Sequence, residues 1–235
     1  LTDEDVLFRQ ELPDGSLRDV AVVRTRADGA ADDGGRARYT IPRERALPIG
    51  RHVIRATVLG DGTDAVLALV VVPRDQAVFV SDVDGTLTET EVAELPALAS
   101  GRLPAAHPHA SLVFQRLAAQ GLVPVYLTAR PEWLTARTRA FLQANGFPPG
   151  VVSTRKDKSG GYGASAAAFK RAELERLAQH VRIEWAFGNM PSDADAYAAI
   201  VRDPRRRILY RHDDVAHGAR RIEAYAELLT ELGDR

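Results

Sequence analysis

Two carboxylates stand two residues apart, directly after an apolar run, in the segment Ser81-Asp82-Val83-Asp84-Gly85-Thr86-Leu87-Thr88. Acids at this spacing can share the work of phosphoryl transfer. Asp82 would attack phosphorus and become an aspartyl-phosphate, while Asp84 would protonate the leaving oxygen and later activate water. Gly85 and Thr86 would let the chain turn and present backbone N–H groups to phosphate oxygens. The alternatives are a surface turn and a calcium loop, but the later acids of a calcium loop are missing.

A hydroxyl follows a second apolar run, in Val125-Tyr126-Leu127-Thr128-Ala129-Arg130-Pro131. Thr128 is predicted to donate a hydrogen bond to the phosphoryl group, and Ala129 and Arg130 are predicted to contact the substrate. Threonine before a helix is also a common N-cap. For Arg130, a guanidinium fork around a phosphate and a surface ion pair are the two interpretations. Because Thr128 comes after the Asp82 motif along the chain and ends another apolar run, the catalytic role is preferred.

A lysine is expected to screen the charge between nucleophile and phosphate, and the chain has only three: Lys156, Lys158 and Lys170. Lys170 lies on a predicted helix, at a reasonable distance before the last motif, and it is the preferred candidate. Lys156 or Lys158 would have to reach from a Gly-rich loop. The alternative for Lys170 is an exposed lysine on the helix surface.

The last motif, Gly188-Asn189-Met190-Pro191-Ser192-Asp193, again follows an apolar run. Mg²⁺ prefers oxygen ligands in octahedral geometry. Asp82, the backbone carbonyl of Asp84 and the Asp193 carboxylate are predicted to supply them, and Asn189 is predicted to ligate through its amide oxygen or through a water. The alternative for Asp193 is an acid that favours the start of a helix. The sequence therefore predicts a Mg²⁺ cofactor.

These motifs must be positioned by a fold whose apolar runs alternate with amphipathic stretches, a pattern typical of a parallel sheet covered by helices. The predicted strands are Ala77–Val80, Val123–Leu127, Ile183–Phe187 and Ile208–Tyr210. The predicted helices are Ala110–Gln120, Pro131–Asn145, Ala164–His180, Ser192–Val201 and Val215–Leu232. In doubly wound α/β sheets ligands bind at the carboxyl ends of the strands, and every motif lies at such an end or just beyond it. We predict one α/β domain over residues 75–235.

The sequence before residue 75 is different. Short β-prone runs alternate with turn dipeptides such as Asp14-Gly15 and Asp61-Gly62, which are hairpin signals. The predicted strands are Val20–Arg26, Ala37–Ile41, His52–Leu59 and Ala65–Val72. We predict a small all-β sandwich over residues 1–74, similar to immunoglobulin-like or transthyretin-like modules. It has no cluster of acids or histidines with active-site spacing, so packing or recognition is its expected role.

The composition excludes several classes of function. The 235 residues are 45% hydrophobic and 27% charged, as in a globular chain with one sizeable core or two modest ones. The net charge of −1 gives no reason to expect nucleic acid as a partner, and the lack of cysteine excludes disulfides and a Cys nucleophile. No apolar run approaches the ~20 residues of a transmembrane segment. Because the chain begins at Leu1, an upstream signal, anchor or domain stays open, and the localisation is undetermined.

The four motifs resemble those of phosphatases of the haloacid dehalogenase (HAD) superfamily, which use an aspartyl-phosphate and Mg²⁺. Over residues 77–212 they are similar to the catalytic domain of lipins, the Mg²⁺-dependent phosphatidate phosphatases. The C-terminal domain of phosphatidylinositol-transfer proteins is also similar, especially at Arg130-Pro131 and residues 145–153, and is generally taken as a phosphatidate-binding module without activity. Because Asp82 and Asp84 are both present, the resemblance favours the active, lipin-like state.

The resemblance implies a HAD-like fold and hydrolysis of phosphatidate to diacylglycerol and phosphate, with a phospholipid at a membrane surface as the substrate. The insert between the first two motifs, about residues 89–108, is too small for the usual cap domain, so an open, essentially capless site is expected. Unlike lipins, the chain has no N-terminal amphipathic helix. The alternatives are a non-catalytic phosphatidate-binding module and a phosphatase for a soluble phosphomonoester or a phosphoprotein.

Overall fold

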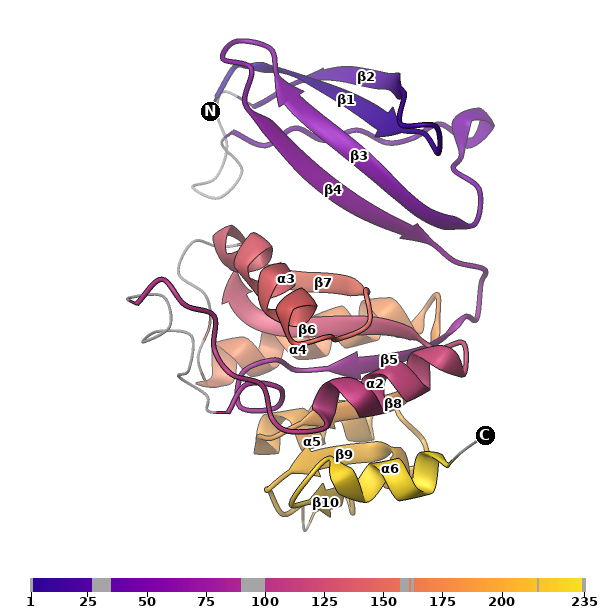
Figure 1. The fold of residues 1–235 in the computed structure, drawn as a ribbon, viewed down its shortest axis with the longest axis vertical. Helices are drawn as coiled ribbons and strands as arrows, with labels where there is room; N and C mark the ends of the chain where they lie inside the picture. The colour runs from indigo at the N-terminus through magenta and orange to yellow at the C-terminus, as the bar shows by residue number, and fades with distance from the viewer. Residues whose placement is uncertain are drawn as a thin grey trace. The chain divides into compact units, whose positions relative to one another are not determined.

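The computed structural model describes residues 2–26, 35–89, 100–156, 161, 163–214 and 216–233. Contacts between residues divide the chain into two compact units, Leu1–Pro73 and Arg74–Arg235. Each unit has a sheet of its own, antiparallel in the first and parallel in the second (Figure 1). The expected combination of an all-β module with an α/β unit is therefore confirmed.

The first unit is a single four-stranded antiparallel sheet with the order β2-β1-β3-β4. Its strands are β1 (Asp5–Glu11), β2 (Leu17–Arg24), β3 (Gly50–Val58) and β4 (Asp64–Val71), and a 3₁₀ turn, η1, covers Arg43–Arg45. Two of the expected hairpins are present, since β1 pairs antiparallel with β2 and β3 with β4; their turns contain Gly15 and Gly62, with φ angles of 81° and 74°. Only glycine adopts such angles without strain.

Two details of the first unit differ from the sequence prediction. The segment 37–41, expected as a strand, is irregular; Pro42 follows it directly and has no N–H to join a ladder. Strand β1, which was not predicted, begins with Asp5 and shows no clean alternation of apolar residues. The described residues hold four strands in one sheet, whereas an immunoglobulin-like sandwich needs about seven strands in two. The expected second sheet is not formed by the described residues.

The second unit is built on a six-stranded sheet with the order β10-β9-β8-β5-β6-β7, in which all neighbouring strands are parallel. Its strands are β5 (Ala77–Ser81), β6 (Val123–Pro131), β7 (Val151–Arg155), β8 (Arg182–Gly188), β9 (Arg207–Tyr210) and β10 (Arg220–Ile222). The chain moves outward from β5 to β7 and then returns to the other side of β5. The strand order therefore switches between β5 and β8, where such sheets bind ligands.

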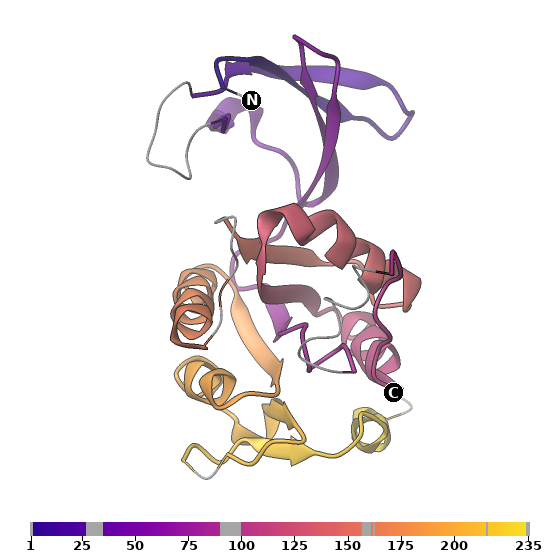
Figure 2. The ribbon, with the colours of Figure 1, turned by 90° about the vertical axis from the view of Figure 1, so that its left-hand side faces the viewer.

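Helices cover both faces of this sheet, as a doubly wound fold requires (Figure 2). They are α2 (Ala110–Ala119), α3 (Thr135–Ala144), α4 (Gly163–Ala178), α5 (Pro191–Ala198) and α6 (Ala226–Leu232), with 3₁₀ turns η2 (Glu132–Leu134) and η3 (Pro204–Arg206). One core holds Phe114 of α2, Phe141 of α3 and Leu228 of α6. The other holds Leu174 of α4 and Tyr197 of α5. The predicted α/β class is confirmed.

The C-terminal part of the second unit differs from the prediction of one helix over residues 215–232. Residues 220–222 form β10, and only the last turns form α6; Val215 lies outside the described residues. Gly218, with a φ of 68°, interrupts helical geometry, and Ile222 is buried in the core. Strand β7 was also missed, and residue 131, expected to begin a helix, ends β6 instead.

Replacing Phe114 with alanine is expected to lower the free energy of unfolding of the second unit by about 3–5 kcal/mol, because the fully buried ring would leave a cavity. The Phe114 ring centroid lies 4.9 Å from that of Phe79 and 4.8 Å from that of Phe187. Leu112→Ala, on the same helix but 41% exposed, is the matched control and should change stability by no more than about 0.5 kcal/mol. Urea unfolding of both variants gives the comparison, and equal losses would contradict the packing argument.

Candidate functional site

Asp82 leaves the end of β5 beside β8, at the switch in strand order. Its backbone N–H donates to the carbonyl of Phe187 over 2.9 Å, and its side chain is buried. The chain then turns at Gly85, which has a φ of 70° and whose N–H donates to the Thr88 hydroxyl over 2.9 Å. Nε2 of His107 lies 3.2 Å from the Gly85 carbonyl oxygen. The first motif is thus a hydrogen-bonded turn at the carboxyl edge of the sheet.

Lys170 of α4 lies between two acids of the site. Its Nζ is 2.9 Å from Oδ1 of Asp82 and donates to Oδ1 of Asp193 over 2.8 Å, and all three side chains are buried. The structure thereby joins residues of the first motif, the lysine candidate and the last motif. Lys156 is exposed near the end of β7, and Lys158 lies outside the described residues.

Burial sets the electrostatics of this cluster. It raises the pKa of Asp82 to about 7, against the opposing charge of Lys170 and with the support of the nearby charges of Asp193 and Asp84. Burial alone lowers the pKa of Lys170, but the charges of Asp82 and Asp193 and hydrogen bonds to both raise it above its ordinary value. Lys170 therefore stays protonated at neutral pH, whereas burial favours the neutral form of the Asp82 carboxyl.

Asp193 organises the last motif. Its Oδ2 accepts hydrogen bonds from the backbone N–H groups of Asn189 and Met190, each over 3.2 Å, while Oδ1 accepts from Lys170. Both of its oxygens are therefore occupied by protein donors. Asp193 fixes the loop that presents Asn189, at the start of α5.

Asn189 and Asp82 both contact the hydroxyl of Thr86. The Thr86 Oγ1 donates to Oδ1 of Asn189 over 2.9 Å and lies 3.4 Å from Oδ2 of Asp82. The carbonyl of Thr86 in turn accepts from the buried Tyr225 hydroxyl over 2.9 Å. An amide oxygen and a carboxylate oxygen therefore both lie within 3.4 Å of the Thr86 hydroxyl. The sequence assigned Thr86 a backbone role, and its side-chain contact and the Tyr225 contact had no local signal.

Asp84 is held by two side chains of β6. Arg130 directs Nε and Nη2 at its carboxylate, the shortest contact being 2.6 Å from Nη2 to Oδ1, and Thr128 Oγ1 donates to Oδ2 over 3.3 Å. Arg130 is buried, so its ion pair is not the surface pair that the sequence offered as one interpretation. Ala129 contributes its carbonyl to the N–H of Gly161 over 3.1 Å. The structure therefore groups Thr128 and Arg130 around Asp84.

All of the possible Mg²⁺ ligands in this group are oxygen atoms. Within the described ranges no three His, Cys, Asp or Glu side chains are arranged to hold a metal ion. Asp193 is turned to Lys170 and to backbone amides, so a cation here would rely on the Asp82 carboxylate, the Asn189 amide oxygen and the Asp84 carbonyl. These are hard donors of the kind that Mg²⁺ takes, and the residues fit this cofactor.

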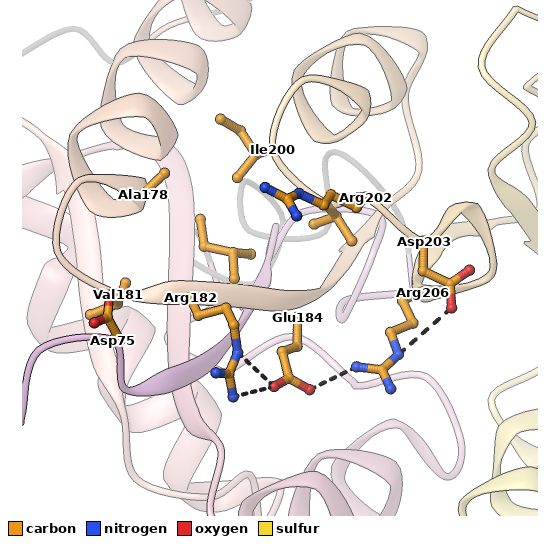
Figure 3. Close-up of a pocket in the computed structure, with 11 residues that line it drawn as sticks. Asp75, Ala178, Val181, Arg182, Glu184, Ile200, Arg202, Asp203 and Arg206 are labelled. Carbon is orange, nitrogen blue, oxygen red and sulfur yellow. Dashed lines mark hydrogen bonds and ion pairs between the residues drawn. The ribbon is translucent and has the colours of Figure 1, made fainter.

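A cavity of about 730 Å³ lies elsewhere, at the amino end of β8 (Figure 3). Its charged side chains neutralise one another: Glu184 pairs with Arg182 and Arg206 over 2.7 Å each, and Arg206 approaches Asp203 over 3.9 Å. It contains none of the predicted site residues. Doubly wound sheets bind ligands at the carboxyl edge and not at the amino edge, so the cluster around Asp82 is the better candidate.

Replacing Gly188 with alanine is expected to lower the free energy of unfolding by about 1–3 kcal/mol, because overpacking forces neighbouring groups apart. An added Cβ would lie 2.5 Å from the Cβ of Asp193, which is fixed by its hydrogen bonds. Gly60→Ala is the matched control: its Cβ would meet only the carboxylate end of Glu4, a flexible side chain. Urea unfolding should separate the two variants, and similar values would contradict the tight fit at Gly188.

Comparisons with known proteins agree with the resemblance to the C-terminal domain of phosphatidylinositol-transfer proteins. The model of the family described as "PITM 1-3, LNS2 domain" matches residues 79–208. Membrane-associated phosphatidylinositol transfer protein 1 of Rattus norvegicus is 30% identical over 201 residues, which cover 85% of this chain and 15% of that protein. The human membrane-associated phosphatidylinositol transfer protein 2 is 28% identical over 173 residues, 74% of this chain and 12% of its own length. Protein retinal degeneration B of Drosophila melanogaster is 28% identical over 160 residues, 67% of this chain and 12% of its own length.

Among solved structures, a class C acid phosphatase from Bacillus anthracis, with tungstate bound, superposes with a TM-score of 0.40 at 18% identity. The match covers 51% of this chain and 54% of the phosphatase. The chain itself spans no more than 15% of the length of the relatives named above. No helix in the part of the chain that the structure describes is long and apolar enough to cross a membrane. Since the family model matches more than half of the sequence, the chain belongs to the LNS2 domain family of PITM 1–3.

Proposed function

We propose that this chain is a Mg²⁺-dependent phosphatase that forms an aspartyl-phosphate on Asp82, with phosphatidate as its substrate. The observation that carries the proposal is the buried contact of Lys170 with both Asp82 and Asp193, with the charge of a second carboxylate, Asp84, acting on Asp82. A structural ion pair needs only one acid, whereas a nucleophile that meets a phosphate needs a cation beside it.

In the first half of the reaction, a carboxylate oxygen of Asp82 bonds to phosphorus and the ester P–O bond breaks. The protonated Asp84 gives its proton to the leaving alkoxide, which departs as the alcohol. In the second half, Asp84 removes a proton from water as the water oxygen bonds to phosphorus. The acyl P–O bond then breaks, which releases phosphate and restores Asp82 as a carboxylate and Asp84 as an acid. Lys170 stabilises negative charge on Asp82 and on the transferred group.

Mg²⁺ would be held by the Asp82 carboxylate, the Asn189 amide oxygen and the Asp84 carbonyl, and it would supply positive charge to the phosphoryl oxygens. Thr86, which contacts both Asp82 and Asn189, orients these two ligands. Asp193 acts one step further out, because it fixes the backbone of Asn189. These roles make Asp193 a supporting residue in our proposal, where the sequence alone favoured direct ligation.

A lipid substrate is supported by family membership. The relatives are named as membrane-associated phosphatidylinositol transfer proteins, and a phosphomonoester on a lipid, such as phosphatidate, combines that setting with the chemistry of the Asp82 cluster. The second candidate function is a phosphatidate-binding module without turnover. Family membership favours it too, because the relatives are named as lipid transfer proteins and not as phosphatases.

The two functions are separated by phosphate release from phosphatidate in mixed micelles, measured with Mg²⁺ and with EDTA, alongside p-nitrophenyl phosphate. Metal-dependent release from the lipid, well above release from the aryl ester, is the expected result. Release from the aryl ester alone would keep the chemistry and reject the lipid. Binding of phosphatidate-containing vesicles without release from either ester would make the chain a binding module.

Adding Mg²⁺ to the metal-free protein is expected to raise the temperature of unfolding. At a free concentration of about 100 times the dissociation constant, a single site adds about 2.7 kcal/mol, which is roughly 5–10 °C for a unit of this size. Differential scanning calorimetry with Mg²⁺ and, as a control, with matched NaCl measures the effect. Asn189→Ala, which removes one ligand, should reduce the Mg²⁺-dependent rise, and an undiminished rise would place the ion elsewhere.

A further inference from the structure

The carboxylate of Asp84 is fixed by one guanidinium group. Nε of Arg130 lies 2.9 Å from Oδ2 and 3.2 Å from Oδ1, and Nη2 lies 2.6 Å from Oδ1. Arg130 is buried, whereas the Asp84 side chain remains 20% exposed. A two-pronged arginine contact fixes the plane of a carboxylate as well as its position. The exposed part of Asp84 is therefore presented in one orientation.

Arg130 is itself fixed from behind. Its Nη1 donates to Oγ1 of Thr138 over 3.2 Å, and that hydroxyl donates to the carbonyl of Leu134 over 3.0 Å. Thr138 is fully buried on α3, so the guanidinium cannot turn toward the site without losing a hydrogen bond to a buried partner. Successive hydrogen bonds from Leu134 through Thr138 and Arg130 to Asp84 therefore link α3 to the first motif.

We propose that Arg130, braced by Thr138, is a positioning residue that aims Asp84 at the leaving oxygen, and not a ligand of the substrate phosphate. The inference deepens the proposed function and rests on it. A general acid works only within hydrogen-bond reach of the atom it protonates, and two free torsions would otherwise scatter the Asp84 carboxyl. The clamp restricts them.

The clamp also has a consequence for substrate class. An alkoxide such as that of diacylglycerol is a poor leaving group and must receive a proton as the P–O bond breaks. A p-nitrophenolate leaves without one. The positioning of Asp84 is therefore needed for alkyl phosphomonoesters and is nearly irrelevant for activated aryl esters. Arg130 thus becomes a determinant of selectivity for alkyl esters, although it touches neither phosphate nor alcohol.

The test compares the wild type, Arg130→Gln, Arg130→Lys and Thr138→Val on short-chain phosphatidate and on p-nitrophenyl phosphate, with saturating Mg²⁺. For Arg130→Gln, kcat on the alkyl ester is expected to fall about 10²–10⁴-fold, the usual contribution of a general acid. On the aryl ester kcat should fall less than about tenfold, with KM little changed on both. Arg130→Lys keeps the charge without the fork and should show the same pattern; Thr138→Val should show it more weakly. Arg171→Gln, an exposed change on α4, is the control.

Three results would overturn the inference. Equal losses of kcat on both esters would indicate a purely structural role for Arg130, and a raised KM on both would indicate that it binds the substrate phosphate. Faster turnover by the Arg130 variants would indicate that its contact with Asp84 inhibits the reaction. A double-mutant cycle with Asp84→Asn, read as temperatures of unfolding, tests the clamp without activity: additive shifts would reject it. A wild type that releases no phosphate from either ester would instead reject the proposed function, and the proton-transfer role with it.

Discussion

Phosphate release is expected to fall by about 10³-fold or more when Asp82 is replaced by asparagine, because loss of a covalent nucleophile leaves only the surrounding charges and binding groups to catalyse. An amide cannot form the acyl-phosphate. Asparagine has nearly the same shape, so the contact with Lys170 and the turn after β5 should survive. Release from phosphatidate, measured with Mg²⁺ at saturating substrate, gives the result.

Glu175→Gln, which removes an exposed carboxylate from α4, is the matched control and should retain wild-type release. Substantial turnover by Asp82→Asn at an unchanged temperature of unfolding would exclude Asp82 as the nucleophile.

The Asp82→Asn variant also tests how the stability of the protein depends on pH. Since burial raises the pKa of Asp82 to about 7, the metal-free folded protein binds a proton more tightly than the unfolded chain, whose carboxyl titrates near its ordinary value. The wild type should therefore lose stability relative to the variant as the pH rises from about 4 to about 7.

Replacing Lys170 with methionine is expected to lower the free energy of unfolding at pH 8 by about 3–5 kcal/mol, because breaking a buried ion pair leaves uncompensated charge in the interior. Here one cation serves two buried carboxylates, Asp82 and Asp193, which would face each other without it. Methionine keeps the length and apolar stem of the side chain. Phosphate release should be lost as well, since Asp82 and the transferred group would lose the positive charge of Lys170.

Arg171→Met is the matched control for this loss, because Arg171 is the next residue on α4 and is exposed. It should change stability by no more than about 0.5 kcal/mol. Urea unfolding at pH 8 and at pH 5 measures both variants. The loss for Lys170→Met should be smaller at pH 5, where Asp82 is protonated below its raised pKa and carries no charge to leave unpaired. Equal losses at both pH values would mean that packing, and not charge, explains the position of Lys170.

The sequence was informative where local pattern and site coincide. The first motif follows an apolar strand, and in a parallel sheet the residue after a strand lies at the carboxyl edge, so the position of Asp82 at that edge follows from the sequence. The choice of Lys170 depended on the scarcity of lysine and on its distance from the last motif. The structure places its Nζ beside Asp82 and Asp193.

Other features depend on contacts between distant segments, which no local pattern reports. The partner of Arg130 is 46 residues away, so a surface ion pair and a phosphate fork were equally compatible with the sequence. The segment 220–222 has helix-forming neighbours, yet it is a strand because it pairs with β9 and buries Ile222. The role of Thr138 is invisible locally, since a threonine on a helix is not in itself a signal. Tertiary context decides each of these cases.

The hydrogen bond from Tyr225 to the Thr86 carbonyl has a consequence for how a working fragment should be cut. The family match ends at residue 208, and every motif residue lies before it. Tyr225 lies beyond it, fully buried, with its ring stacked on Tyr210 at 5.4 Å, and it supports the turn that carries Asp84. A fragment trimmed to the matched segment would keep every predicted site residue but lose this hydrogen bond, so a fragment that preserves the turn has to extend past Tyr225.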